Sequence, residues 1–133
     1  MKNILFCCVF AASALAQAQT QPMVASEYQA AKSRIEADHT AAEGRCGAMQ
    51  ANAKDICEKE ADGQSKVARA ELEQRYKPSA SNARKVTEVK IKAEYAIANE
   101  KCEDLKADAK KSCEKESKAK RDRSNADLKS SKT

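Results

Sequence analysis

Two stretches of equal length decide how this chain folds: CGAMQANAKDIC, which is Cys46–Cys57, and CEDLKADAKKSC, which is Cys102–Cys113. The cysteines of each stretch are eleven positions apart. In an unbroken helix such residues lie on one face but about 16 Å apart along the axis. A disulfide requires α-carbons within about 7 Å. The cysteines of one stretch can therefore bond only if the helix breaks between them.

Two architectures follow from this geometry. Asn52 and Asp108 lie midway between the cysteines and are good N-caps, so a break there predicts an all-α fold of tandem disulfide-clamped helical hairpins with up-down helices. Its disulfides are Cys46–Cys57 and Cys102–Cys113. The alternative is one long antiparallel helical hairpin or coiled coil folded at Pro78, which pairs Cys46 with Cys113 and Cys57 with Cys102. The local pairs are favoured because short loops cost less entropy to close.

The surroundings of the two stretches match as well, which indicates an internal duplication. The shift that carries Cys46 onto Cys102 also carries the run Cys57–Glu60 onto Cys113–Glu116 without a gap. It superimposes further identical pairs: Ile35 on Ile91, Ala37 on Ala93, Ala42 on Ala98, Ala53 on Ala109, Lys54 on Lys110 and Leu72 on Leu128. One supersecondary unit is therefore used twice.

Residues 1–18 have the layout of a secretory signal peptide. Lys2 precedes an uncharged run, Ile4–Ala16, and small residues allow cleavage after Ala16 or Ala18. The run is short for a membrane span, so we expect no stable span after processing. Two cysteines, Cys7 and Cys8, lie inside this run. The four cysteines that remain after cleavage are an even number in a short exported chain, which is typical of disulfides. Their spacing does not match a zinc site, so we expect no metal and no cofactor.

The chain beyond the signal divides at a linker. We expect a first helical repeat over 19–76, a linker over 77–83, a second repeat over 84–128 and a flexible tail over 129–133. Pro78 disfavours helix at Lys77, and Ser81 or Asn82 could cap the next helix.

Each repeat carries one apolar stripe at helical spacing. The first stripe is Tyr28, Ala31, Ile35, His39, Ala42, Cys46 and Met49, and the second is Ile91, Tyr95, Ala98, Cys102 and Leu105. Much of the apolar content is Ala, so a large core is not expected. Oppositely charged residues at helical spacing are typical of a solvated face.

No catalytic motif is evident. There is no Gly-rich phosphate loop, no G-x-S-x-G and no H-E-x-x-H. His39 is the only histidine and lies on the apolar stripe, where it is expected to be a core or boundary residue, so we expect no enzyme. Aromatic residues are too few to stack on bases, so no nucleic-acid partner is expected.

Charge is distributed unevenly along the chain. Residues 19–76 contain eight basic and ten acidic residues, whereas residues 77–133 contain sixteen basic and ten acidic residues. A candidate anion-binding cluster lies near the C-terminus: Lys110, Lys111, Lys115, Lys118, Lys120, Arg121 and Arg123. A basic patch attracts polyanions, here anionic lipid, lipopolysaccharide or cell-wall polymer.

Three segments carry a resemblance to a known group of proteins: Tyr28–Ala37, Asn52–Cys57 and Ala70–Pro78. The chain resembles small, uncharacterised, exported helical proteins of Gram-negative bacteria with repeated cysteines, often labelled cell envelope biogenesis or TolA-like. The resemblance implies an envelope location. Such proteins commonly carry Gly-Asn where this chain has Ala51-Asn52 and Ala107-Asp108, and a Gly there would favour a helix break.

Together these features predict a non-catalytic structural or interaction protein of the periplasm that acts through its helix faces. Its partner would be an envelope protein or a second copy of the chain. The alternative is a chaperone-like or polyanion-binding module that uses the basic C-terminal helix.

Overall fold

The computed structural model describes residues 23–131, which form four helices and no strand. The helices are α1 (Ala25–Cys46), α2 (Ala51–Tyr76), α3 (Ala80–Cys102) and α4 (Ala107–Ser130). The prediction of an all-α fold with up-down helices is confirmed. The predicted signal peptide lies outside the described residues.

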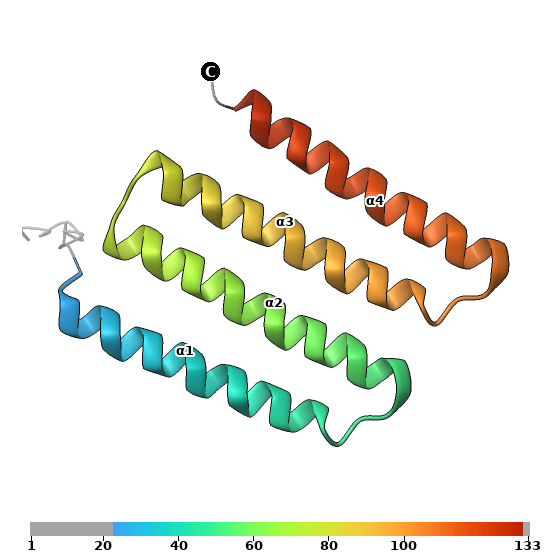
Figure 1. The fold of residues 1–133 in the computed structure, drawn as a ribbon, viewed down its shortest axis with the longest axis horizontal. Helices are drawn as coiled ribbons and strands as arrows, with labels where there is room; N and C mark the ends of the chain where they lie inside the picture. The colour runs from blue at the N-terminus through green and yellow to red at the C-terminus, as the bar shows by residue number, and fades with distance from the viewer. Residues whose placement is uncertain (1–22, 132–133) are drawn as a thin grey trace, which may run out of the picture.

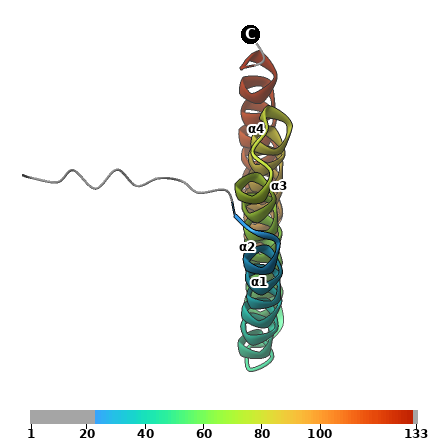
Figure 2. The same cartoon turned by 90° about the vertical axis from the view of Figure 1, so that its left-hand side faces the viewer.

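The four helices lie side by side in chain order and form a single layer (Figure 1). Seen along its edge, the layer is one helix thick (Figure 2). Only helices that follow one another in the chain touch: α1 with α2, α2 with α3, and α3 with α4. The layer therefore has two broad open faces and two free edges, formed by α1 and α4.

Small side chains let the inner helices approach closely. The buried residues of α2 are mostly small and include Ala61, Gly63, Ser65 and Ala70, with Leu72 as the largest. A Cβ added at Gly63 would lie 3.1 Å from the Cβ of Ala93 on α3, which is tighter than an ordinary contact. No residue of α4 is buried. The protein therefore gains little hydrophobic stabilisation from its core.

The ends of each hairpin opposite its tip are fastened by side chains. In the first hairpin, the rings of Tyr28 and Tyr76 stack with centroids 4.4 Å apart, and the Tyr28 hydroxyl donates to Glu73. In the second, the Arg84 guanidinium donates to the carbonyl of Leu128 at 2.9 Å, near the end of α4. Both hairpins are thus held at the end that their disulfides do not reach.

Helix boundaries differ from the sequence prediction in two places. Ser79, and not Ser81 or Asn82, caps α3, since its Oγ accepts from the N–H of Asn82 at 3.0 Å. Helix α3 therefore starts inside the predicted linker 77–83. Helix α4 likewise runs to Ser130, into the predicted tail 129–133.

The break between the cysteines occurs as predicted, but Asn52 and Asp108 do not cap the helices. The N-caps are Gln50 and Lys106, and the helices begin at Ala51 and Ala107. The four-residue connections are alike in the two copies. Met49 N–H donates to the Cys46 carbonyl at 2.9 Å, and Leu105 N–H donates to the Cys102 carbonyl at 3.0 Å. The apolar stripes consequently end at the cysteines, and Met49 and Leu105 lie in the connections, 44% and 41% exposed.

Ala51 and Ala107 have φ angles of 51° and 49°, in the left-handed region that favours glycine. A residue with a Cβ pays roughly 1 kcal/mol there. We therefore expect Ala51→Gly and Ala107→Gly each to raise the free energy of unfolding by about 0.5–1 kcal/mol. Urea unfolding followed by circular dichroism measures this. Ala53→Gly, inside the same helix, is the control and should lower stability by about 1 kcal/mol. Destabilisation by all three substitutions would contradict the assignment.

Candidate functional site

The two hairpin tips are the most firmly fixed part of the layer. Disulfides join Cys46 to Cys57 and Cys102 to Cys113, with Cα–Cα distances of 5.5 and 5.7 Å. These are the favoured local pairs, and not the pairs of the long-hairpin alternative. Cys46 and Cys102 are fully buried, so each disulfide lies against its own hairpin.

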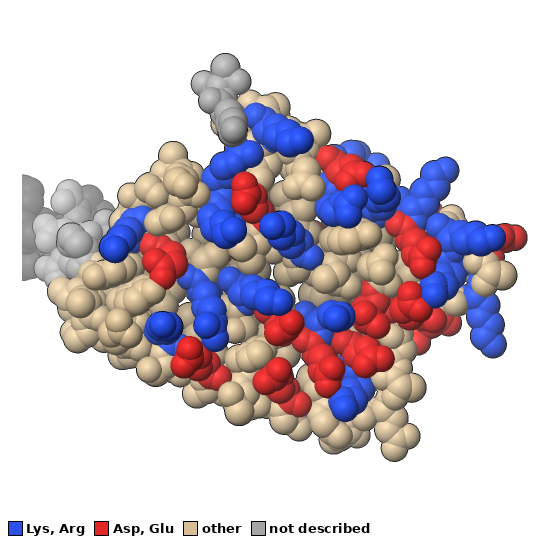
Figure 3. Space-filling model, in the orientation of Figure 1, with Lys and Arg blue, Asp and Glu red and all other residues tan. Residues whose placement is uncertain are grey.

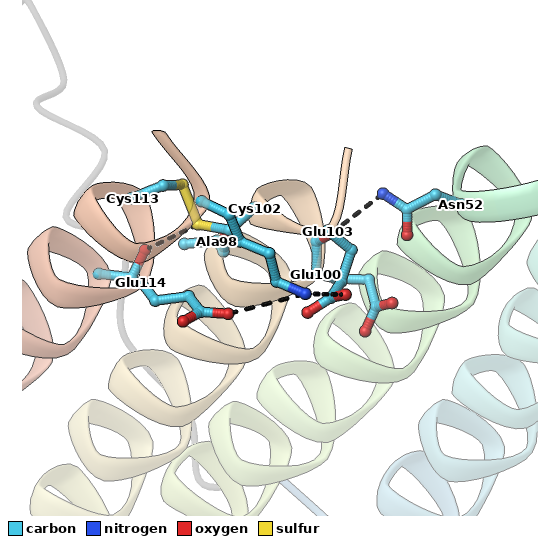
Figure 4. The surroundings of a disulfide bond; sticks show 9 residues. Asn52, Ala98, Glu100, Cys102, Glu103, Cys113 and Glu114 are labelled. Atoms are coloured by element: carbon cyan, nitrogen blue, oxygen red, sulfur yellow. Dashed lines mark hydrogen bonds and ion pairs between the residues drawn. A yellow bond between two sulfur atoms is a disulfide. The ribbon is translucent and has the colours of Figure 1, made fainter. Parts of the chain in front are cut away.

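The first tip also contacts the second hairpin. Instead of capping α2, the Asn52 side chain donates from Nδ2 to the carbonyl of Glu100 at 3.1 Å (Figure 4). That carbonyl is in the last turn of α3 and also accepts from the N–H of Glu103 at 3.0 Å, so Asn52 uses its second lone pair. Asn52 therefore ties the two copies together beside the Cys102–Cys113 disulfide. Sequence spacing alone could not reveal this contact, because it depends on how α2 packs on α3.

Ion pairs complete the α2–α3 boundary. Lys90 Nζ lies 2.6 Å from Glu71 Oε1, and Lys101 Nζ lies 2.8 Å from Glu60 Oε1. Both pairs are roughly half exposed. Exposed pairs contribute only tenths of a kcal/mol each, so their main effect is to set the register of one hairpin against the other.

The predicted anion-binding residues lie along α4, but acidic side chains neutralise most of them. Lys118 lies 2.9 Å from Asp122, Lys120 lies 3.0 Å from Glu94, and Arg121 lies 2.8 Å from Asp122. The Arg121 guanidinium also stacks 4.3 Å from the centroid of Tyr95. Figure 3 shows the same intermixing of basic and acidic side chains over one broad face.

The remaining members of the cluster include both paired and unpaired residues. Lys110 lies 2.6 Å from Glu103, and this hydrogen bond raises the pKa of Lys110. Lys111 lies 3.7 Å from Asp108. Within residues 23–131, Lys115 and Arg123 form no ion pair. Two of the seven predicted residues thus keep an uncompensated charge.

His39 lies in a shallow groove of about 210 Å³ between α1 and α2. The groove is lined mainly by small and apolar side chains: Ile35, Asp38, His39, Ala42, Ala61, Gln64, Ser65 and Ala68. His39 Nδ1 is 3.6 Å from Glu43, and Nε2 is 3.3 Å from Asp62 on α2. In the second copy Tyr95 takes the place of His39, and Arg121 stacks on it from α4.

This arrangement bridges two helices. Ser65 lines the same groove, and both ring nitrogens of His39 face carboxylates. His39, Glu43 and Asp62 bring potential ligand atoms within 4.8 Å of one another. Lys66 Nζ also forms an ion pair with Asp62 Oδ2 at 3.0 Å, so this carboxylate already has a cationic partner.

The Asp62 carboxyl reports on this bridge. The Lys66 ammonium, helped by His39, holds the pKa of Asp62 below its ordinary value of 3.8. We expect Lys66→Gln to raise the pKa of Asp62 toward 3.8, because the largest stabiliser of the charged form is removed. Titration of the side-chain carboxyl carbon by NMR measures this. Lys54→Gln, which removes a comparable pair with Glu58, is the control and should leave Asp62 unchanged. An equal shift in both variants would contradict the assignment.

No helix among residues 23–131 combines the length and apolarity needed to cross a membrane. The chain matches no protein-family model, no curated protein sequence and no solved structure. The geometry of the layer makes its open faces and free edges the candidate functional surfaces.

Proposed function

We propose that this is a non-catalytic interaction protein of the bacterial periplasm that binds an envelope partner through the broad faces of its helical layer. One observation carries the proposal: a layer one helix thick, clamped at both tips, leaves two broad faces open on its inner helices. Most small folds bury such faces against a second layer. A layer held rigid without one is suited to presenting helix faces to another molecule.

The compartment is supported by two features. Two disulfides in so short a chain indicate an oxidising, non-cytoplasmic environment. The signal-like pattern of residues 1–18 and the resemblance to exported Gram-negative proteins both favour the periplasm.

A non-catalytic role is supported by the way the polar groups are used. The single histidine faces two carboxylates, and the cysteines at the tips are joined in disulfides. Their side chains connect helices, which is a structural task.

The test uses two positions on α2 that sample opposite faces. Gln64 and Lys66 are both exposed, and residues two apart in a helix point roughly 200° apart. Since α2 has a neighbour on each side, its exposed residues lie on the broad faces. A photo-reactive phenylalanine analogue is placed at Gln64 or at Lys66, and living cells are irradiated. We expect a discrete adduct with one envelope protein from at least one position.

The control for this experiment keeps the label and removes the fold. The same analogue in a chain lacking both disulfides should give no discrete adduct. Absence of any adduct at both positions of the folded protein, or adducts that survive loss of the disulfides, would overturn the proposal.

A polyanion-binding role is the second candidate, favoured by the unpaired charges of Lys115 and Arg123 on α4. We expect Lys115→Gln with Arg123→Gln to weaken binding to vesicles containing anionic lipid several-fold at low salt. Lys118→Gln with Lys120→Gln removes the same charge from residues that are already paired and should weaken binding less. Co-sedimentation at two salt concentrations measures this. Absence of binding by the unaltered protein at low salt would remove this candidate.

A further inference from the structure

The internal duplication makes the α2–α3 boundary a template for contacts between separate molecules. The second copy packs on the first by placing α3, the equivalent of α1, against α2, the equivalent of α4. The free edge of α4 therefore corresponds to the α2 surface that binds α3. The free edge of α1 corresponds to the α3 surface that binds α2. The α4 edge and the α1 edge are therefore equivalent to the two surfaces that meet where α2 packs on α3.

The charged residues of that interface reappear on the free edges with the same signs. The shift that superimposes the repeats carries Glu60 onto Glu116 and Glu71 onto Asp127, both on α4. In reverse, it carries Lys101 onto Arg45 and Lys90 onto Arg34, both on α1.

All four edge residues are exposed, and within the described chain none of them forms an ion pair. Their internal counterparts are paired at 2.6 and 2.8 Å. The edges thus carry both halves of two ion pairs that are made once inside each molecule.

The steric pattern is compatible with the same docking. Gly63, where an added Cβ would meet α3 at 3.1 Å, becomes Ala119 on the α4 edge, and Ala93 becomes Ala37 on the α1 edge. The added Cβ of Ala119 needs a little more room. Ile97, whose Cδ1 lies 3.5 Å from the position of a Cβ at Gly63, is replaced by Ala41 on the α1 edge. This larger-to-smaller change opens space beside Ala119, while the contact of Ala119 with Ala37 requires the two edge helices to lie slightly further apart than α2 and α3.

We propose that copies of this protein associate head to tail, with the α4 edge of one molecule seated on the α1 edge of the next as α2 is seated on α3. Arg45 would pair with Glu116 of the next copy, and Arg34 with Asp127. The excess of acidic residues over 19–76 and of basic residues over 77–133 also attracts unlike ends of two molecules. Such a contact is heterologous, so it extends into an open array of hairpins unless its rotation closes a ring.

Two differences make this contact weaker than the internal one. Ile97 and Val89 are replaced by Ala41 and Ser33, so less apolar surface is buried. Asp108 takes the place of Asn52 and would offer a carboxylate, not an amide donor, to the carbonyl of Gly44. The association is therefore reversible, concentration-dependent and weakened by salt. Asp108→Asn supplies the missing donor and should tighten it.

Sedimentation velocity of the full, disulfide-bonded chain over a range of concentrations tests the proposal. We expect the average mass of the unaltered protein to rise with concentration above that of the 14.5 kDa chain. Arg45→Glu or Glu116→Lys, each alone, places like charges across the contact and should weaken association several-fold. A one-to-one mixture of the two variants restores opposite charges at every contact and should restore association.

Matched controls keep the outcome decisive. Arg75→Glu makes the same charge change on α2, away from both edges, and should leave association unchanged. Asp108→Asn alters a side chain that is 99% exposed, so it leaves the fold intact and should increase association. A protein that stays monomeric at all concentrations, even as Asp108→Asn, would overturn the proposal. So would charge-reversed variants that behave like Arg75→Glu, or a mixture that fails to restore assembly.

This contact uses the edges of the layer, whereas the proposed envelope partner binds its broad faces. The two proposals can therefore fail separately. Loss of adducts at Gln64 and Lys66 would leave edge-to-edge assembly untouched, and a strictly monomeric protein could still bind a partner through its faces.

Discussion

Serine at Cys46, Cys57, Cys102 and Cys113 together is expected to abolish cooperative folding at room temperature. Each disulfide closes a short loop, because its cysteines are separated by 11 positions. A loop of that length contributes about 3 kcal/mol. Two such contributions approach the whole stability of a small domain, which is roughly 5–15 kcal/mol. A single layer with few buried side chains has little else to hold it.

The measurement is thermal and urea unfolding followed by circular dichroism. Removal of one pair, as Cys46→Ser with Cys57→Ser, should cost about 3 kcal/mol and leave a folded protein. Reduction of the unaltered protein should reproduce the quadruple variant. A quadruple variant that still unfolds cooperatively, within 1 kcal/mol of the parent, would show that packing and not covalent clamping maintains the layer.

Leu72→Ala is expected to produce the largest loss among substitutions that keep both disulfides. Leu72 is 4% exposed and is the largest apolar side chain buried on α2. Its truncation removes buried methyl groups and leaves a cavity, which typically costs 2–5 kcal/mol. Little neighbouring core is available to fill that space, because the other buried residues of α2 are Ala, Gly and Ser.

Leu105→Ala is the matched control, since Leu105 is 41% exposed in the α3–α4 connection. It should change the free energy of unfolding by about 0.5 kcal/mol or less. Urea unfolding of both variants measures the difference. Similar losses in the two variants would mean that Leu72 is not part of a packed core.

The hairpins and their disulfides could be predicted from the sequence because they depend on local properties. Cysteine spacing, loop entropy and helix length constrain the tips without knowledge of the rest of the molecule. The same reasoning placed the N-caps at Asn52 and Asp108, whereas the helices begin at Ala51 and Ala107. Alanine at a positive φ is a strained choice that helix and turn propensities do not anticipate.

The arrangement of the hairpins was harder to predict because it depends on contacts between distant residues. Amphipathic stripes rich in Ala are compatible with a closed bundle or with an open layer, since small side chains give little energetic preference for either. The pairing of Lys120 with Glu94 likewise depends on the register of α4 against α3. Charge counting therefore predicted a more uncompensated basic cluster than the structure has.

The duplication connects what the sequence predicts locally with what depends on contacts between hairpins. It could be read from identical residues at one fixed shift, yet its consequence emerges only when the α2–α3 boundary is known. Arg34, Arg45, Glu116 and Asp127 look like ordinary solvated charges in the sequence. The internal ion pairs reveal them as the equivalents of residues that already bind one hairpin to another.

The thickness of the molecule in solution tests the central claim that this fold is a single clamped layer. Small-angle X-ray scattering from dilute monomer, analysed as a flat particle, gives that thickness directly. A single layer predicts about 10–12 Å, the diameter of one helix with its side chains. A value near 20 Å, as expected if α1 folded over onto α4 to form two layers, would contradict the account.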